Sequence, residues 1–450
     1  MGFSGGASLV KPFFNSGKLS AILSSLKHGH VLIDASGLIH AAMSIHARGI
    51  IAGDWVPFDR DVTARLNTWQ YAKEDVIPVF VIDGHRCGAK RANLDRQKER
   101  DEAMESIEAI RVQMAGLKRD FLACIEEEKK EAASAASSSS TVAQAIDLAS
   151  QRQALTQQAC EADKKLRSCE RRAVGAHAPE AAYRMLQMCA SRKIATIVAA
   201  GEAEHTMAAY FALSQAEGAF DYDVAAVCGY DTDFFVLGCP IVLYGQGLQG
   251  VLARLEWSKI GAELIKKSDY LLGQLGKADS DAILTAMHKY GAKLVVQLTA
   301  LFSDNDYVAY PGVGPAKLAA TWKLLLGSDE LPTLRTFAAQ LATFQWKTKA
   351  TQWLRNADAV DELTRRAERA AFMYFGQPVI VGEKLYFPPL PAFVAGCCAR
   401  LFAEVPPTGH FAPGRRLLYK MQRAEDKDVT QLAEFVTQFS KADLVRWANG

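Results

Sequence analysis

Two fully apolar runs of the chain each end on an aspartate, and this pattern constrains the fold more than any other feature of the sequence. The first run is HVLIDASG, in which Asp34 follows the apolar residues, and the second is IPVFVIDG, which closes on Asp83. Continuous apolar strands separated by helix-prone segments are typical of a parallel sheet that helices cover on both faces. The pattern therefore predicts an α/β fold with both aspartates at the carboxyl edge of the sheet, where such sheets place their ligands.

A third segment, residues 201–238, adds two further acidic pairs to this prediction. Glu202 and Glu204 precede an apolar pattern of helical spacing, while Asp231 and Asp233 follow a short apolar run at residues 224–227. Carboxylates gathered at one edge repel one another unless cations lie between them, so the pattern favours a divalent-metal site. Each feature alone also has an ordinary structural explanation. Acidic residues complement a helix N-terminus, an aspartate at a strand-to-helix turn commonly caps the helix, and an isolated Asp-x-Asp is usually solvated.

Composition excludes several classes of protein. The 450 residues carry 52 lysines and arginines against 50 acidic residues, so no overall basic charge indicates a nucleic-acid partner. The nine cysteines are scattered without a Cys-x-x-Cys motif, which predicts neither a zinc site nor a disulfide framework. No apolar run approaches the length of a membrane span, and the first residues lack the features of a secretory signal. We therefore expect a soluble intracellular protein.

Five segments occur in an order that resembles the signatures of the flap endonuclease/XPG/exonuclease 1 family of structure-specific 5′ nucleases. They are VLIDASGLIH, VFVIDG, GEAEHTMAAYF, GYDTDFFVLG and DYVAYPGVGPAKL, and the resemblance spans residues 1–390. It implies a PIN-like nuclease core of class α/β, with a central mostly parallel sheet flanked by helices. It also implies a helical arch and a helix-two-turn-helix region that binds duplex.

The resemblance implies a metal centre with two Mg²⁺ ions, for which Mn²⁺ can substitute. The implied metal ligands are seven carboxylates: Asp34, Asp83, Glu202, Glu204, Asp231, Asp233 and Asp306. The spacing from Asp306 to Gly312 is one residue shorter than the family usually shows, so Asp304 is the alternative seventh ligand. Asp306 is preferred because Tyr307 follows it.

Basic residues after Asp83 are the expected phosphate contacts, because cations there can hold a phosphate over an acidic pocket. The resemblance assigns a catalytic lysine seven residues beyond Asp83, which is Lys90. The matching arginine position is occupied by Gln97, so the arginine role is assigned to the neighbouring Arg96. The rest of this charged segment has a plainer explanation as a solvated helical arm.

A second set of residues is expected to bind the DNA duplex. Glycines before a helix let backbone N–H groups approach a phosphate, and the helix N-terminus favours its charge. The expected contacts are Gly312, Val313, Gly314 and Lys317, with a monovalent cation at the same element. His40 is also expected to contact DNA, and it occupies a position where flap endonucleases carry a tyrosine, which favours the exonuclease 1 branch. A histidine packed within the helix is the alternative.

The remaining elements are predicted from local pattern. Residues 38–46 form a helix, 194–198 a strand, 240–257 a β-hairpin, 293–302 a helix, 334–375 further helices, 379–387 a closing strand and 430–447 a terminal amphipathic helix. Residues 132–141 are a low-complexity, flexible stretch. The predicted regions are an N-terminal nuclease region at 1–110, an arch or insert at 111–178, an internal nuclease region at 179–290, a helix-two-turn-helix region at 291–390 and a helical extension at 391–450.

The predicted activity is Mg²⁺-dependent hydrolysis of DNA phosphodiester bonds near 5′ ends, nicks or flaps, with a preference for 5′-to-3′ exonuclease action. A flap endonuclease, a non-catalytic scaffold or post-transcriptional regulator, and a PIN-type ribonuclease are the alternatives. The expected partners are branched, nicked or 5′-ended DNA, with RNA left open and no membrane. The expected location is the nucleus.

Overall fold

The computed structural model describes most of the chain up to residue 395. The described residues are 15–26, 28–71, 75–84, 91–134, 141–199, 201–215, 223–229, 233–245, 251–257, 277–303, 310, 312–344, 358–375, 379–381, 384–386 and 391–395. The chain divides into two compact units. The first comprises Met1–Leu38, Ala64–Asn93 and Leu186–Gly450, and the second comprises Ile39–Thr63 and Leu94–Met185.

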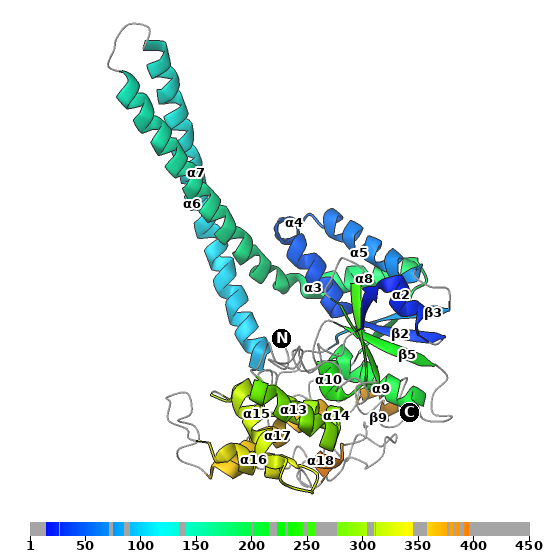
Figure 1. The fold of residues 1–450 in the computed structure, drawn as a ribbon. Coiled ribbons are helices and arrows are strands. Elements are labelled where there is room, and N and C mark those ends of the chain that lie inside the picture. Colours follow the sequence, from blue (N-terminus) through cyan, green and yellow to red (C-terminus); the bar gives the residue numbers. More distant parts are fainter. Residues whose placement is uncertain are drawn as a thin grey trace, which may run out of the picture. The chain divides into compact units, whose positions relative to one another are not determined.

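The first unit is built on a seven-stranded sheet with the order β1-β7-β6-β5-β2-β3-β4. Figure 1 labels its strands β2, β3 and β5. Its strands are β1 (Asn15–Lys18), β2 (Gly29–Asp34), β3 (Val76–Ile82), β4 (Ala195–Val198), β5 (Val224–Gly229), β6 (Ile241–Gly245) and β7 (Val251–Glu256). The five strands from β6 to β4 are parallel, while β7 and β1 pair antiparallel at one side. The sheet is therefore central and mostly parallel, which confirms the predicted α/β class.

The helices of the first unit, except α2 (Leu19–Ser24), contribute residues with the sheet to one continuous core, and α2 lies against β1 and β7. The helices that contribute are α9 (Ala203–Gln215), α10 (Asp233–Leu237), α13 (Lys277–Tyr290), α14 (Ala292–Leu301), α15 (Pro315–Leu325), α16 (Leu334–Ala342), α17 (Ala359–Phe375) and α18 (Ala392–Ala395). The core contains fully buried Phe211, Phe234 and Trp322. Trp322 also donates its indole N–H to Thr299 Oγ1 at 2.9 Å, so its polar atom is satisfied within the apolar environment.

The second unit contains a long helical hairpin, α6 (Arg91–Ser134) and α7 (Thr141–Ala173), followed by a 3₁₀ turn at Val174–His177 (Figure 1). A small apolar cluster of Ala103, Ile107, Leu166, Cys169 and Ala173 joins the two helices at one end. Farther along, the Cys124 thiol lies 3.5 Å from the Leu148 carbonyl oxygen. The predicted charged helical arm is thus a pair of packed antiparallel helices.

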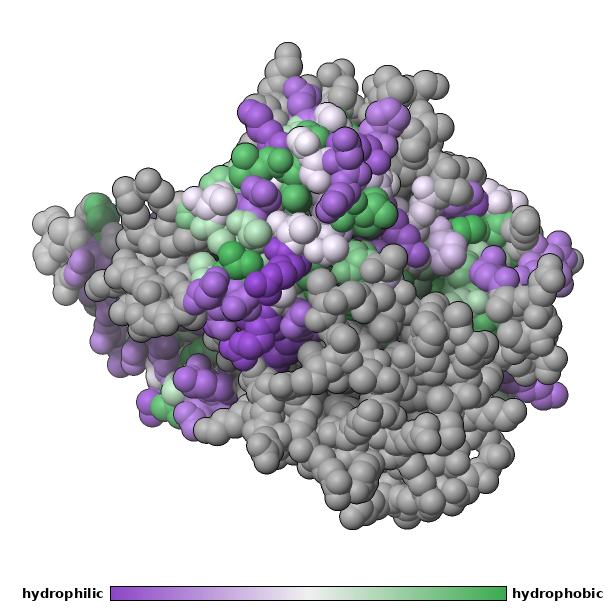
Figure 2. Space-filling model, turned by 90° about the horizontal axis from the view of Figure 1, so that it is seen from below, coloured by the Kyte–Doolittle hydropathy of each residue, from purple (hydrophilic) through white to green (hydrophobic). Residues whose placement is uncertain are grey.

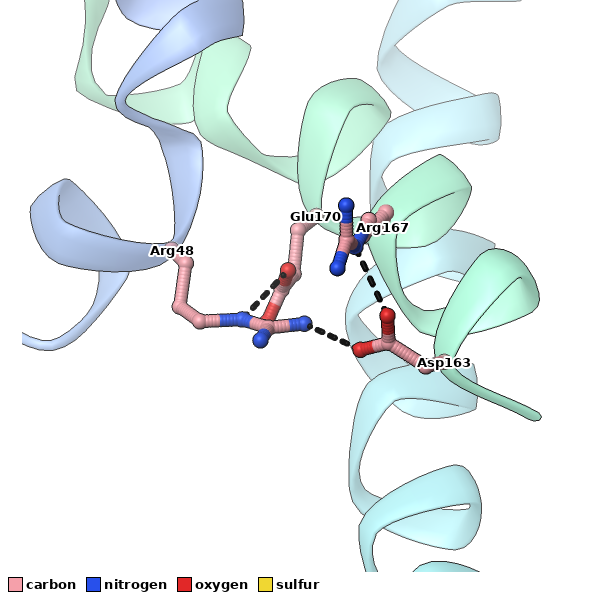
Figure 3. Close-up of polar contacts among 4 residues, drawn as sticks. All are labelled: Arg48, Asp163, Arg167 and Glu170. Carbon is pink, nitrogen blue, oxygen red and sulfur yellow. Dashed lines mark hydrogen bonds and ion pairs between the residues drawn. The ribbon is translucent and has the colours of Figure 1, made fainter. Parts of the chain in front are cut away.

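An ion-pair cluster joins α7 to the short helix α4 (Ala47–Ile51), as Figure 3 shows. Arg48 Nε donates to both carboxylate oxygens of Glu170 at 3.1 Å, and Arg48 Nη2 donates to Asp163 at 3.0 Å. Arg167 also pairs with Asp163 at 2.7 Å. The Glu170 side chain is only 3 % exposed, so its charge is balanced by a guanidinium that is itself half exposed.

Four helices run from one unit into the other along the chain: α3 (Ala35–Ile45), α5 (Val56–Gln70), α6 and α8 (Ala178–Ser191).

The structure corrects three local predictions. Helix α3 begins at Ala35 rather than at residue 38. The predicted low-complexity stretch 132–141 is helical at its two ends, because α6 extends to Ser134 and α7 begins at Thr141.

The predicted closing strand at residues 379–387 is the third correction. It is two short strands, β8 (Val379–Val381) and β9 (Lys384–Tyr386), which pair antiparallel with Val379 opposite Tyr386. The Gly-Glu pair between them is a sequence that favours a tight hairpin connection. The predicted hairpin at 240–257 is confirmed as β6 and β7. The predicted helix at 430–447 lies outside the described residues.

The face drawn in Figure 2 carries both hydrophilic residues, in purple, and hydrophobic residues, in green. None of the helices that the structure describes is both long and apolar enough to cross a membrane.

Candidate active site

Adjacent parallel strands place Asp34 at the same edge of the sheet as the end of β3, which Asp83 follows. Asp34, the last residue of β2, lies beside Val81 of β3, and Ile33 lies beside Cys228 of β5. Asp83 follows Val81 by two residues, and Asp231 follows the final residue of β5, Gly229, by two residues in the sequence. The structure thus confirms that the ends of β2, β3 and β5 are neighbours. Asp231 itself lies outside the described residues.

Asp34 caps helix α3. Its carboxylate accepts the backbone N–H of Ser36 at 2.8 Å through one oxygen and that of Gly37 at 3.3 Å through the other. The residue is 3 % exposed. This cap satisfies amide groups that a helix N-terminus leaves without partners, which explains why α3 begins immediately after the strand. The capping alternative for Asp34 is therefore observed in the structure.

Asp83 connects the end of β3 to the start of α9. One carboxylate oxygen of this exposed residue accepts the backbone N–H of Ala203 at 2.8 Å. The next residue, Gly84, donates its N–H to the Gly201 carbonyl oxygen at 2.8 Å. Because Ala203 is the first residue of α9, these bonds hold Glu202 and Glu204 near the edge where β3 ends. Both glutamates are half-buried.

Ser36, which no sequence pattern indicated, links the ends of β2 and β3. Ser36 Oγ accepts the backbone N–H of Asp83 at 3.5 Å, so the first turn of α3 contacts the end of β3. Its position two residues after Asp34 is a signal that could have found it, since short polar side chains near strand ends commonly bond to neighbouring backbone groups.

Asp233 occupies a different environment from the other acids. It is the first residue of α10 and is 2 % exposed. The Tyr374 hydroxyl lies 3.5 Å from its carboxylate, and Tyr374 is itself buried at the end of α17. No local sequence signal pointed to Tyr374, because the contact joins residues 141 positions apart.

Electrostatics supports the proximity of β5 to Asp34. Burial raises the pKa of the Cys228 thiol, and the negative charge of Asp34 raises that pKa further. Cys228 is 1 % exposed. It is therefore a neutral, buried thiol at the strand end, which favours a packing role over a nucleophilic one.

The described carboxylates do not make a complete metal centre by themselves. Within the ranges that the structure covers, no three histidine, cysteine, aspartate or glutamate side chains form a group that could hold a metal ion. Their chemistry nevertheless suits Mg²⁺, which prefers carboxylate and water oxygens. Asp231, Asp304 and Asp306 lie outside the described residues, so a complete set would need members from that part of the chain.

The predicted phosphate contacts are only partly described. Lys90 lies outside the described residues, and Arg96 is in α6 with a side chain that is also outside them. His40 is exposed on α3 and belongs to the second unit. Of these three side chains, the structure thus describes only that of His40.

The predicted duplex anchor forms a turn before α15. Gly312 has a positive φ of 84°, and Gly314 is the extended residue before the helix, with φ −115° and ψ 171°. Val313 donates its N–H to the Tyr310 carbonyl oxygen at 3.0 Å. The Lys317 ammonium donates to the Gly312 carbonyl oxygen at 2.8 Å, and burial lowers the pKa of Lys317. Lys317 thus stabilises the turn from within.

The chain is distantly similar to two solved structures. No protein-family model and no curated relative matches the chain. A structure of the catalytic core of Rad2 in complex with DNA substrate (complex II) is 13% identical with a TM-score of 0.38, over 84% of this chain and 95% of that chain. A second structure of that core with DNA substrate (complex III) is 13% identical with a TM-score of 0.40, over 97% and 99%. At these values, neither likeness carries an argument about what this chain does.

Proposed function

We propose that this chain is a divalent-metal-dependent nuclease that hydrolyses DNA phosphodiester bonds near 5′ ends, in the manner of the flap endonuclease/XPG/exonuclease 1 family. One observation carries the proposal. Strand β2 ends in Asp34, Asp83 directly follows the neighbouring strand β3, and the Asp83 carboxylate caps the helix whose start bears Glu202 and Glu204. The order of the five sequence segments gives independent support.

In this proposal, Asp34, Asp83, Glu202 and Glu204 supply oxygen ligands together with Asp231, and Asp233 and Asp306 or Asp304 complete the acidic set. Bound Mg²⁺, or Mn²⁺ in its place, would supply an activated water and stabilise the charge of the leaving oxygen. The contribution of the chain is to hold the carboxylates rigidly at one edge. The caps on α3 and α9 do this, because each fixes a carboxylate oxygen against a backbone amide.

Positive groups are proposed to hold the DNA backbone. Lys90 and Arg96 would bind the phosphate of the bond that is hydrolysed. The turn from Gly312 to Gly314 would bind the duplex together with a monovalent cation, and His40 would contact DNA. We assign Lys317 a positioning role in this set, since its ammonium already donates to the Gly312 carbonyl oxygen. Specificity would then come from the shape of the DNA rather than from its bases.

A non-catalytic scaffold is the second candidate, and a specific observation favours it. Asp34 and Asp83 each cap a helix, so both have a structural reason to be present without any metal. The proposed activity therefore needs a test that separates the two roles of these residues. Asparagine provides it, because it keeps an acceptor oxygen for the cap and removes the charge that a metal requires.

The experiment uses the purified full chain with Mg²⁺ and DNA labelled at the 5′ end as flap, nicked and blunt duplexes. The variants are Asp34→Asn, Asp83→Asn and Asp231→Ala, and the matched control is Asp281→Asn, an exposed residue of α13. We expect cutting that EDTA abolishes, that the three variants lose and that the control keeps.

The products separate the alternatives. Release of mononucleotides supports the preferred exonuclease action, and release of whole flaps supports a flap endonuclease. A parallel RNA substrate tests a PIN-type ribonuclease. Absence of Mg²⁺-dependent cutting on every substrate would overturn the proposal in favour of the scaffold. A tagged full chain that fails to enter the nucleus would contradict the proposed location.

A further inference from the structure

A pocket of about 590 Å³ lies within the first unit, and it contains none of the proposed metal ligands. It is formed by one side of α9, the turn after α10, the start of α14, and the end of α17 with α18. Its volume falls within the range of sites that hold small organic molecules. The chemistry of its lining then determines which molecules could bind.

Most of the lining is apolar. Leu237, Leu294, Phe375 and Phe393 contribute aliphatic and aromatic surface. Tyr290 contributes its ring, since its hydroxyl lies against the Leu325 and Ser328 carbonyl oxygens, at 2.5 and 2.9 Å. A molecule bound here would therefore bury a mainly apolar body.

One lysine supplies a positive charge to this pocket. Lys293 packs against Gly238, whose backbone has φ +69° and where an added Cβ would lie 2.2 Å from Lys293 Cε. The side chain as a whole is exposed, but the neighbouring residues remove enough water to lower the pKa of Lys293. Within the described part of the chain, no carboxylate forms an ion pair with Lys293. Its charge is thus available to a ligand.

Cys239, the titratable group beside Lys293, does not neutralise it. Burial raises the pKa of the Cys239 thiol to about 12, although the nearby ammonium acts in the opposite direction. The thiol is 2 % exposed and stays neutral at pH 7. The pocket therefore presents a positive charge that no neighbouring thiolate balances.

We propose that this pocket binds a small organic monoanion whose carboxylate or sulfonate pairs with Lys293 and whose apolar body lies against Leu237, Tyr290 and Phe375. Lys293 is the one lysine of the lining, which holds no arginine and one histidine, the buried His205. One negative charge on an otherwise apolar molecule therefore pairs with Lys293, because a charge buried without a partner is costly. The inference is independent of the proposed nuclease activity, since none of its residues is a proposed metal ligand or phosphate contact.

The test measures binding of anilinonaphthalene sulfonate, an apolar monoanion, to the full chain by fluorescence titration. We expect saturable binding at one site in the unaltered chain. Lys293→Met should weaken it by about tenfold, the effect of losing one partly desolvated ion pair. Lys293→Arg should retain it. The matched control Lys323→Met removes an exposed lysine of α15 and should leave binding unchanged.

Three further measurements keep the result unambiguous. Ala212→Phe fills the pocket from α9 and should abolish binding, and circular dichroism of each variant verifies that it is folded. The neutral analogue N-phenylnaphthylamine should bind the unaltered chain more weakly than the sulfonate does. Its affinity for the Lys293→Met chain should equal its affinity for the unaltered chain. Absence of saturable binding, or equal affinity of the unaltered and Lys293→Met chains for the sulfonate, would overturn the proposal whether or not the chain cuts DNA.

Discussion

At the scale of single residues, the strand-end aspartates are first of all helix caps. Asp34 accepts two backbone N–H groups of α3, and Asp83 accepts that of Ala203. A cap needs only an oxygen acceptor, whereas a metal ligand of this kind needs a charge. The two roles therefore predict different responses to the same substitutions.

Replacing Asp34 separates these roles. Asp34→Asn should keep the free energy of unfolding within about 1 kcal/mol, because the amide oxygen can still accept the shorter bond, from Ser36, and only the longer one, from Gly37, is lost. Asp34→Ala should cost about 1–2 kcal/mol. Under the proposed function, both variants should lose about 100-fold in Mg²⁺-dependent cutting, as expected for a lost ligand. Denaturant melts and cutting assays on the same preparations check this. Full cutting by a folded Asp34→Asn variant would rule Asp34 out as a ligand.

Gly229, the last residue of β5, is the second position where one side chain decides the outcome. An added Cβ would lie 2.1 Å from Phe234 Cε2, and Phe234 is fully buried. Gly229→Ala should therefore destabilise the first unit by about 1–3 kcal/mol, the usual cost of overpacking. It should also displace the start of α10, which carries Asp233.

The matched control for this prediction is Gly314→Ala. Its added Cβ would meet nothing within 4 Å, and its φ of −115° suits any residue. We expect no loss of stability there. Equal denaturant midpoints for the two variants would show that the contact between Gly229 and Phe234 does not constrain the strand end.

At the scale of elements, the Arg48 cluster fixes α7 to α4. Arg48→Met would leave the buried Glu170 carboxylate without the two hydrogen bonds from Arg48 Nε. Because Arg48 is half exposed, we expect a cost of about 1–3 kcal/mol, below that of breaking a fully buried pair. Hydrogen exchange of α4 and the end of α7 should accelerate. Arg152→Met, which removes the exposed pair with Glu128, should have little effect.

The same cluster predicts a dependence on pH. The hydrogen bond from Arg48, followed by that from Arg167, lowers the pKa of Asp163 below its usual 3.8. A lowered pKa in the folded state contributes stability that is present above the unfolded pKa and is lost as pH falls through the folded pKa. Thermal melts at pH values from about 5 down to 2 should therefore show a loss below about pH 4 that is smaller in Arg48→Met. An identical acid dependence in both chains would contradict this account.

Elements with a strong local pattern were predictable from the sequence. The apolar strands β2, β3 and β5, helix α9 and the β6–β7 hairpin all follow from residue periodicity and turn residues. Strand β1 was not predictable from the sequence, because its residues NSGK carry no strand pattern. They form a strand by pairing with β7, with Asn15 opposite Arg254. Ser36 and Tyr374 were missed for a similar reason. Their roles depend on contacts between segments far apart in the sequence, which no local pattern encodes.

At the scale of the whole molecule, the proposed metal ligands and the long helical hairpin belong to different units. Every proposed carboxylate belongs to the first unit, while nearly all of α6 and all of α7 belong to the second. At 1.5 Å per residue, the 44 residues of α6 extend for roughly 66 Å. The apolar cluster of Ala103, Ile107, Leu166, Cys169 and Ala173 lies at one end of the hairpin, and the buried Cys124 contacts Leu148 farther out.

Shortening the hairpin tests this division. Replacing residues 119–154 by a Gly-Ser turn keeps the apolar cluster, the Arg48 contacts, Lys90 and Arg96. It removes the exposed Glu128–Arg152 pair and the contact between Cys124 and Leu148. We expect denaturant midpoints close to those of the full chain, less helical ellipticity, and retained Mg²⁺-dependent cutting. The contrasting variant is Leu166→Asp in the full-length chain, which places a charge in that cluster and should destabilise the second unit by about 2–4 kcal/mol. If the shortened chain unfolds as readily as Leu166→Asp, the outer hairpin stabilises the second unit and the packing at its inner end is insufficient.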